Sequence, residues 1–242
     1  FFSLWIFVCF FLQSFISFLI IYDNTKNLTF SIIGSLFFLI SPIFISQIML
    51  HLALAGHWLI LMGFYVEKRN IPTKKTFYWT TLISLSALIH FYFTIILFGM
   101  FLLFIFHEYL INFNTKKLII RILIPTIFLL ITMYIFGYFK VPFTDSLAHG
   151  YGIYKLNLLG IVSPILQSQS GIVDWSLFLP EISASPAEKS EGFSYLGIGG
   201  IILLLIGIFI IFTNITEFKK KNYRPYFFII ILFLLIALTN RI

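Results

Sequence analysis

The chain has 242 residues, of which 60% are hydrophobic and only 10% are charged, and its mean hydropathy is +1.02. A soluble globular domain carries about 25% charged residues, so this composition excludes an ordinary water-soluble domain. The net charge of +7 is spread over short clusters between apolar runs, which argues against a nucleic-acid-binding face. The single cysteine, Cys9, excludes an intrachain disulfide. Because the chain begins at Phe1 inside an apolar run, we expect it to be a fragment of a longer protein.

Apolar runs follow one another along almost the whole chain. A bilayer-spanning helix needs about 20 residues, so the length fits about seven or eight spans. We therefore predict an all-α, polytopic bundle of transmembrane helices over residues 1–139 and 196–242. The intervening residues 140–195 are rich in Gly, Pro, Ser and acidic side chains and are predicted to form one long loop. The apolar runs are residues 1–22, 30–47, 50–66, 76–110, 118–139, 196–212 and 226–238.

The run over residues 76–110 is too long for one crossing unless it tilts strongly, and His90 interrupts it near the middle. Two shorter helices, at about 76–88 and 92–110, are therefore predicted. Their connection near residues 88–92 would be the turn of a helical hairpin.

Loop charges give the expected orientation in the membrane. Residues 67–75, 112–121 and 217–224 each carry a net charge of +3, whereas residues 140–195 carry −2. Cytoplasmic loops are enriched in Lys and Arg, so the three basic loops are predicted to be cytoplasmic and the long loop periplasmic. The run over 76–110 must then cross twice, which puts its turn on the outer side. The expected location is the bacterial inner membrane, with several passes.

Four of the five histidines converge on the outer side in this topology. His51, His90 and His149 fall at the outer face, and His57 lies one to two turns deeper. Ionisable groups in a membrane usually face a bundle interior or an aqueous cavity, where they serve a path or a site. The alternative is that each histidine is an interfacial residue bonded to a neighbouring helix. His107 and Glu108 are predicted to form a solvated helix cap at the cytoplasmic side.

Asp145 and His149 are four residues apart, which would place both on one face of a short helix. They are weak candidates for metal ligands, because two ligands do not make a site. The favoured alternative is that Asp145 caps a short helix that ends at Gly150.

The predicted outer loop also combines aromatic and polar side chains of the kind that bind sugars. Aromatic rings stack on pyranose faces, and polar groups hold the hydroxyls. The same aromatic residues are also typical of the belt at a membrane surface, and composition does not separate the two interpretations. The candidate residues in this loop are Tyr154, Lys155, Asn157, Glu191 and Tyr195.

Four segments together resemble an uncharacterised bacterial family of polytopic membrane proteins that is similar to the C-type (GT-C) lipid-linked-sugar glycosyltransferases. They are His-Leu-Ala-Leu-Ala-Gly-His-Trp-Leu-Ile-Leu at 51–61, His-Phe-Tyr at 90–92, Gly-Tyr-Gly-Ile-Tyr-Lys-Leu-Asn at 150–157 and Glu-Gly-Phe-Ser-Tyr-Leu-Gly at 191–197. The resemblance covers about residues 42–200. In such enzymes the catalytic carboxylate sits in the first outer loop, and this chain has no such loop with an acidic pair. A proline often follows the hairpin histidine in the family, where this chain has Phe91.

The resemblance implies an enzyme that transfers a sugar from a polyprenyl-phosphate carrier to an envelope glycan or lipid at the periplasmic face. A carboxylate base, expected upstream of this fragment, would activate the acceptor hydroxyl. The outer histidines, with Lys155 or a divalent metal ion, would stabilise the leaving lipid phosphate. The implied partners are membrane lipids and the polyprenyl-phosphate-linked sugar, and no nucleic-acid partner is expected. The implied substrate-binding residues are His51, His57, His90, His149, Tyr154, Lys155, Asn157, Glu191 and Tyr195.

Two other functions stay open at this point. A transporter or flippase of lipid-linked saccharide would line a path with ionisable residues near mid-membrane and would show two related halves. The second is a non-catalytic scaffold subunit of an envelope-synthesis complex, which nothing in the sequence excludes.

Overall fold

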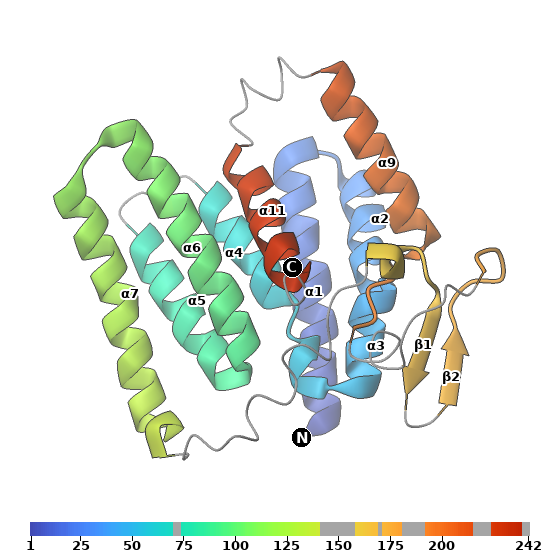
Figure 1. Ribbon diagram of the computed structural model, residues 1–242, viewed down its shortest axis with the longest axis horizontal. Coiled ribbons are helices and arrows are strands. Elements are labelled where there is room, and N and C mark those ends of the chain that lie inside the picture. The colour runs from blue at the N-terminus through green and yellow to red at the C-terminus, as the bar shows by residue number, and fades with distance from the viewer. Residues whose placement is uncertain (70–73, 141–157, 169–170, 181–191, 215–223, 239–242) are drawn as a thin grey trace. The chain divides into compact units, whose positions relative to one another are not determined.

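A computed structural model of the chain describes residues 1–69, 74–140, 158–168, 171–180, 192–214 and 224–238. The chain divides into two compact units, each built from two segments. Unit 1 comprises Phe1–Ile32 and Gly56–Phe143, and unit 2 comprises Ile33–Ala55 and Thr144–Ile242. Helices dominate both units (Figure 1).

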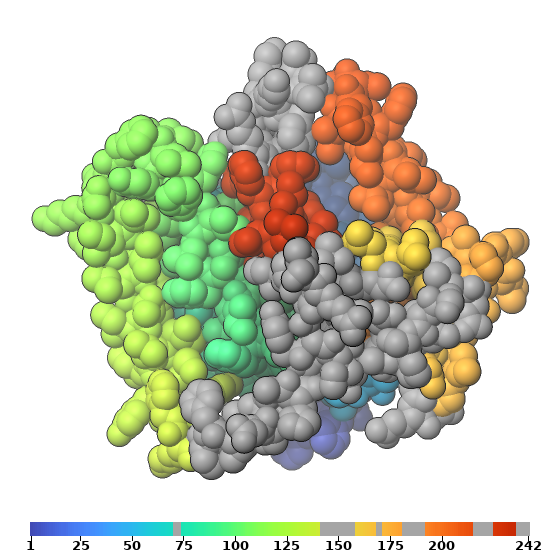
Figure 2. All heavy atoms as spheres, in the orientation of Figure 1, coloured from blue at the N-terminus to red at the C-terminus, as the bar shows by residue number. Residues whose placement is uncertain are grey.

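Unit 1 is a helical bundle in which α5 is the central element. Helix α5 packs against α4, α6 and α7, and α1 packs against α4 (Figure 1). Helix α7 forms one surface of the unit (Figure 2), and α2 begins in unit 1 and ends in unit 2. The elements are α1 (Phe2–Thr25), α2 (Leu28–Leu39), α4 (Trp58–Lys68), α5 (Lys75–Ile89), α6 (Phe91–Asn112), α7 (Thr115–Ile135) and the short 3-10 helix η2 (Tyr138–Lys140).

The long apolar run over residues 76–110 forms two helices, with the break at His90 where the sequence predicts it. His90 has extended backbone, ends α5 and begins α6. Its N–H donates to the carbonyl of Ser86 at 2.9 Å, and its Nδ1 accepts from the N–H of Tyr92 at 3.2 Å. The side chain of His90 therefore caps the start of α6, and one residue is enough for the turn between α5 and α6.

Close packing in unit 1 centres on Gly63 of α4. A Cβ atom at this position would lie 3.0 Å from Leu97 Cδ2, 3.2 Å from Trp79 Cη2 and 3.3 Å from Met100 Cε. All three of these neighbours are almost fully buried, and they come from α5 and α6. Small residues allow helices in apolar bundles to approach closely, so Gly63 sets the distance between α4 and the α5–α6 hairpin.

Unit 2 contains short helices and one β-hairpin. Strands β1 (Ile165–Ser168) and β2 (Gly171–Asp174) pair antiparallel, with Ile165 opposite Asp174 and Ser168 opposite Gly171. Leu166, Phe193 and Tyr195 form the buried cluster beside the hairpin. The other elements are α3 (Pro42–Leu50), the 3-10 helices η1 (Leu52–Ala55) and η4 (Leu158–Ile161), and the helices α9 (Gly197–Thr213) and α11 (Arg224–Leu238).

This hairpin corrects the all-α prediction, which treated residues 140–195 as a loop. The two strands have four residues each, too few to show a clear alternation of apolar and polar side chains in sequence. The run over residues 30–47 also differs from the expected single helix, since α2 ends at Leu39 and α3 begins at Pro42. Proline at the first position of α3 explains this break, because its ring lacks the N–H that would continue a helix.

Four helical segments are long and apolar enough to cross a membrane. They are Phe2–Thr25, Leu28–Leu50, Phe91–Asn112 and Thr115–Ile135, where the second joins α2 and α3. The helices Gly197–Thr213 and Pro225–Leu235 are apolar but shorter. The chain is therefore mostly helical with four candidate spans among the residues that the structure describes, and the count of seven or eight spans stays a prediction.

Replacing Gly63 tests the close contact between α4 and the α5–α6 hairpin. We expect Gly63→Val to lower the free energy of unfolding by about 1–3 kcal/mol, because the added side chain must displace buried neighbours. Gly207→Val in α9 is the control, since no atom lies within 4 Å of a Cβ at that position. The free energy of unfolding of both variants is measured by SDS titration in detergent micelles. Equal losses of stability would contradict the packing role of Gly63.

Candidate functional site

The two ends of unit 1 carry different chemistry. Glu67 near the end of α4 pairs with Lys75 at the start of α5, and Glu108 near the end of α6 pairs with Arg121 in α7. These helix termini make up what we call the charged end. The opposite termini, which are the start of α4, the α5–α6 turn and the end of α7, make up the histidine end.

The histidine end brings together His57 and the α5–α6 turn. His57 precedes α4, and its ring centroid lies 6.1 Å from that of Phe93 in an edge-on arrangement. Phe93 lies three residues after His90, within the first turn of α6, so the two histidines lie at the same end of unit 1. The ring of His90 lies 4.7 Å from that of Tyr92. His57 and His90 therefore share one end of unit 1, and their placement at the outer side of a membrane stays a prediction.

Tyr138 is a residue of this end that the sequence analysis missed. Its hydroxyl donates to the carbonyl of Ala87 in the last turn of α5, and its ring lies 6.2 Å from that of Phe91. It thereby fastens the end of α7 to the hairpin turn. No sequence signal identified it, because the contact joins residues 51 apart in the chain.

The arrangement offers imidazole groups beside exposed aromatic rings. His57 is half-buried, and the rings of Phe91 and Tyr92 are 42% and 59% exposed. Imidazole can donate to a phosphate oxygen or carry a proton, and exposed aromatic rings can contact a sugar face or a lipid chain. This end of unit 1 is therefore the candidate functional site.

The other predicted site residues fall outside this grouping. His51 is exposed in unit 2, and Tyr195 is only 1% exposed in the core of unit 2, where its ring packs against Phe193. A buried core position gives Tyr195 a packing role. His149, Tyr154, Lys155, Asn157, Glu191 and the weak metal candidate Asp145 lie outside the described residues.

Metal ligands do not gather in the part of the chain that the structure describes. No group of three or more His, Cys, Asp or Glu side chains there could hold a metal ion. The histidine end by itself therefore offers imidazole and aromatic groups.

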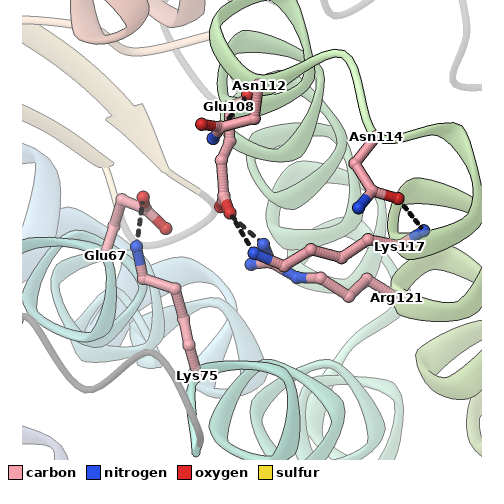
Figure 3. A network of polar contacts seen from close by, with 7 residues as sticks. All are labelled: Glu67, Lys75, Glu108, Asn112, Asn114, Lys117 and Arg121. Atoms are coloured by element: carbon pink, nitrogen blue, oxygen red, sulfur yellow. Dashed lines mark hydrogen bonds and ion pairs between the residues drawn. The ribbon is translucent and has the colours of Figure 1, made fainter.

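The charged end contains two ion-pair clusters (Figure 3). Lys75 Nζ lies 2.6 Å from Glu67 Oε1, and the indole Nε1 of Trp79 donates to Glu67 Oε2 at 3.3 Å. In the second cluster Lys117 Nζ lies 3.1 Å from Glu108 Oε1, and Arg121 Nη1 donates to Glu108 Oε2. Glu108 thus links α6 to α7.

Glu108, which the sequence predicts to be part of a solvated helix cap, is partly exposed and pairs with Lys117 and Arg121 of α7. A two-residue turn at Phe113 and Asn114 reverses the chain direction and makes α6 and α7 antiparallel. Glu108 and Arg121, which are 13 residues apart in the chain, therefore face each other. Asn114 stabilises the reversal, because its Oδ1 accepts from the N–H of Lys117 at 2.9 Å. The sequence signal that could have identified this pair is the opposite charge of the residues on either side of the turn, with Glu108 before it and Arg121 after it.

Charge is distributed unevenly between the two ends. Over α4 to α7 the charged end carries seven Lys and Arg residues against two Glu residues, whereas the histidine end carries Lys140, within the described residues. The basic members of the charged end are Lys68, Arg69, Lys74, Lys75, Lys116, Lys117 and Arg121.

These features define a mostly helical protein in which four helical segments, within the part of the chain that the structure describes, are long and apolar enough to cross a membrane. The whole chain, residues 1–242, matches a family that is described as a domain of unknown function (DUF6311), and the chain belongs to this family. No curated protein and no solved structure matches the chain. The similarity to C-type glycosyltransferases therefore stays a prediction.

Glu67→Gln tests the more buried ion pair of the charged end. The side chains of Glu67 and Lys75 are 16% and 17% exposed, so neutralising the carboxylate leaves the ammonium without its counter-charge. We expect the free energy of unfolding to fall by about 1–3 kcal/mol. The control Asp23→Asn removes a pair in which Lys26 is 68% exposed, and such pairs contribute about 1 kcal/mol or less. The free energy of unfolding of both variants is measured by SDS titration. An equal loss of stability in the two variants would contradict the larger contribution of the buried pair.

Proposed function

We propose that this chain belongs to a multi-pass protein of the bacterial inner membrane that transfers a sugar from a polyprenyl-phosphate carrier to an envelope glycan or lipid at the periplasmic face. The observation that carries the proposal is the separation of chemistry in unit 1. Basic side chains gather at one end, and His57 and the His90 turn gather at the other. We further propose that the complete bundle has seven or eight spans.

The separation supports an orientation. Lys and Arg are enriched on the cytoplasmic side of membrane proteins, and seven of them lie at the charged end against two Glu residues. The charged end is therefore assigned to the cytoplasm, and the histidine end to the periplasm. Polyprenyl-phosphate sugars are used at that face by the enzymes that this sequence resembles.

The chemistry follows from the bonds that must change. An acceptor hydroxyl oxygen forms a bond to the anomeric carbon of the sugar, while the bond from that carbon to the carrier phosphate breaks. The hydroxyl proton passes to a carboxylate base, as in the enzymes that this sequence resembles. Negative charge grows on the departing phosphate, so donors such as the imidazoles of His57 and His90 lower the barrier.

Residues outside the described part of the chain complete this proposal. Lys155 or a divalent metal ion would add positive charge at the phosphate, and Tyr154, Asn157 and Glu191 would hold the sugar. The exposed rings of Phe91 and Tyr92 are suited to contact the sugar or the first isoprenoid units.

The position of the charged residues favours a site at one face over a path through the membrane. Of the residues that the structure describes in α1 and α4 to α7, every Asp, Glu, Lys and Arg lies within seven residues of a helix end. A transporter of a charged lipid-linked saccharide would need such groups near the midplane. The scaffold alternative has no observation of its own in its favour.

Cysteine labelling tests the orientation. In a Cys9→Ser background we expect Lys140→Cys to react with a membrane-impermeant maleimide from the periplasmic side, because Lys140 lies exposed at the histidine end. Lys116→Cys, exposed at the charged end, should react only after the membrane is opened. Labelling of both cysteines from the same side would exclude the proposed orientation.

Consumption of a lipid-linked donor tests the activity. Membranes containing the full-length protein receive radiolabelled polyprenyl-phosphate sugars, and loss of donor is measured. We expect His57→Ala to slow this loss by about tenfold or more, since a donor to the developing phosphate charge is removed. His107→Ala is the matched control, because this histidine lies at the charged end.

Two results would argue against the proposal. One is the absence of donor consumption by folded, inserted wild-type protein with every donor supplied. The other is an equal slowing of donor consumption in the two histidine variants.

A further inference from the structure

A small hollow lies between the end of α6 and the start of α7. Its cavity volume is about 20 Å³, room for little more than one water-sized group, and it is open to the surroundings, so an oxygen of a phosphate can enter while the rest of the group lies outside. Its polar lining consists of Glu108, Tyr109, Asn112, Asn114, Lys117 and Arg121. Figure 3 shows the side chains of Lys117 and Arg121 reaching from α7 toward Glu108.

The hollow holds more positive than negative charge. Glu108 carries one negative charge, and Lys117 and Arg121 together carry two positive charges. One positive charge therefore remains after the ion pairs are counted. The side chain of Lys117 is 55% exposed, so its ammonium can bind a second group while it contacts Glu108.

Arg121 adds an unused donor. Its side chain is only 12% exposed, and its Nη1 donates to Glu108. Its Nε atom is buried and has no hydrogen-bond partner within the described residues. Burial of a guanidinium donor without a partner is unfavourable, which is a reason to expect an acceptor or water from outside the chain.

Exposed apolar side chains are sequence neighbours of the residues that line the hollow. Ile111 and Phe113, on the α6 side, are 61% and 72% exposed, and Ile119 and Ile120 of α7 are about half exposed. Such exposed apolar surface at the ends of two candidate spans is suited to acyl chains. A cationic hollow directly beside it then lies at the depth of phospholipid headgroups.

We propose that the hollow between α6 and α7 binds the headgroup phosphate of an anionic phospholipid, held by Lys117 and Arg121, in the leaflet at the charged end. Basic pockets between transmembrane helices on the cytoplasmic side bind anionic headgroups in this way. The proposal requires only that α6 and α7 lie in a bilayer, and it does not depend on glycosyl transfer. The bound lipid would complete the polar shell of Arg121 and hold the α6–α7 turn.

Native mass spectrometry of the full-length protein in detergent tests this site. Phosphatidylglycerol and phosphatidylcholine with the same acyl chains are titrated, and dissociation constants for the first bound lipid are compared. We expect phosphatidylglycerol to bind more tightly, and Lys117→Gln to weaken its binding by about fivefold, the effect of one lysine near a headgroup. Lys116→Gln is the matched control, because it removes the same charge from the neighbouring exposed residue, which does not line the hollow. We expect less than a twofold change for this control.

Three results would overturn the proposal. Equal binding of the two lipids by wild-type protein would remove the need for an anionic headgroup. Equal weakening in the two lysine variants would indicate diffuse attraction to the basic end in place of a site. Displacement of phosphatidylglycerol by excess inorganic phosphate, at an ionic strength matched with chloride, would assign the hollow to a free anion.

Discussion

The cost of placing charge among apolar helices is the constraint on which the rest of unit 1 depends. Transferring an unpaired ammonium or carboxylate out of water costs several kcal/mol, so charged side chains collect at helix ends or form pairs. Glu67 with Lys75, and Glu108 with Lys117 and Arg121, show both effects. These pairs tie consecutive helices together at one end, which leaves the opposite end to His57 and the His90 turn.

Close packing fixes the separation between α4 and the α5–α6 hairpin that carries both ends. Gly63 lets α4 approach Trp79 of α5 and Leu97 of α6, so α4 packs against both helices of the hairpin. The indole of Trp79 packs against Phe101 and also donates to Glu67, which couples the core to the charged end. His57 at the start of α4 is consequently held beside Phe93 at the start of α6.

The two proposals use the two ends of the same bundle. At the histidine end, imidazoles and exposed rings suit a lipid-linked sugar phosphate. At the charged end, the excess of positive charge over Glu108 suits an anionic headgroup, and the proposed orientation in the membrane rests on the same excess of charge. Both ligands are phosphates attached to long apolar chains, which is the class of molecule that a bundle of exposed apolar helices meets in a bilayer.

The sequence alone determined the presence of helices apolar enough to cross a membrane, the break at His90 and the excess of charge in the basic loops, because hydropathy and charge are properties of local composition. Tertiary structure was needed for the Glu108 to Arg121 pair, the contact of Tyr138 with Ala87 and the burial of Tyr195. The β-hairpin was also missed, since four-residue strands carry too little periodicity. For Glu108 with Arg121 and for Tyr138 with Ala87, the deciding contact joins residues 13 and 51 positions apart in the chain, and only the packing of the helices brings them together.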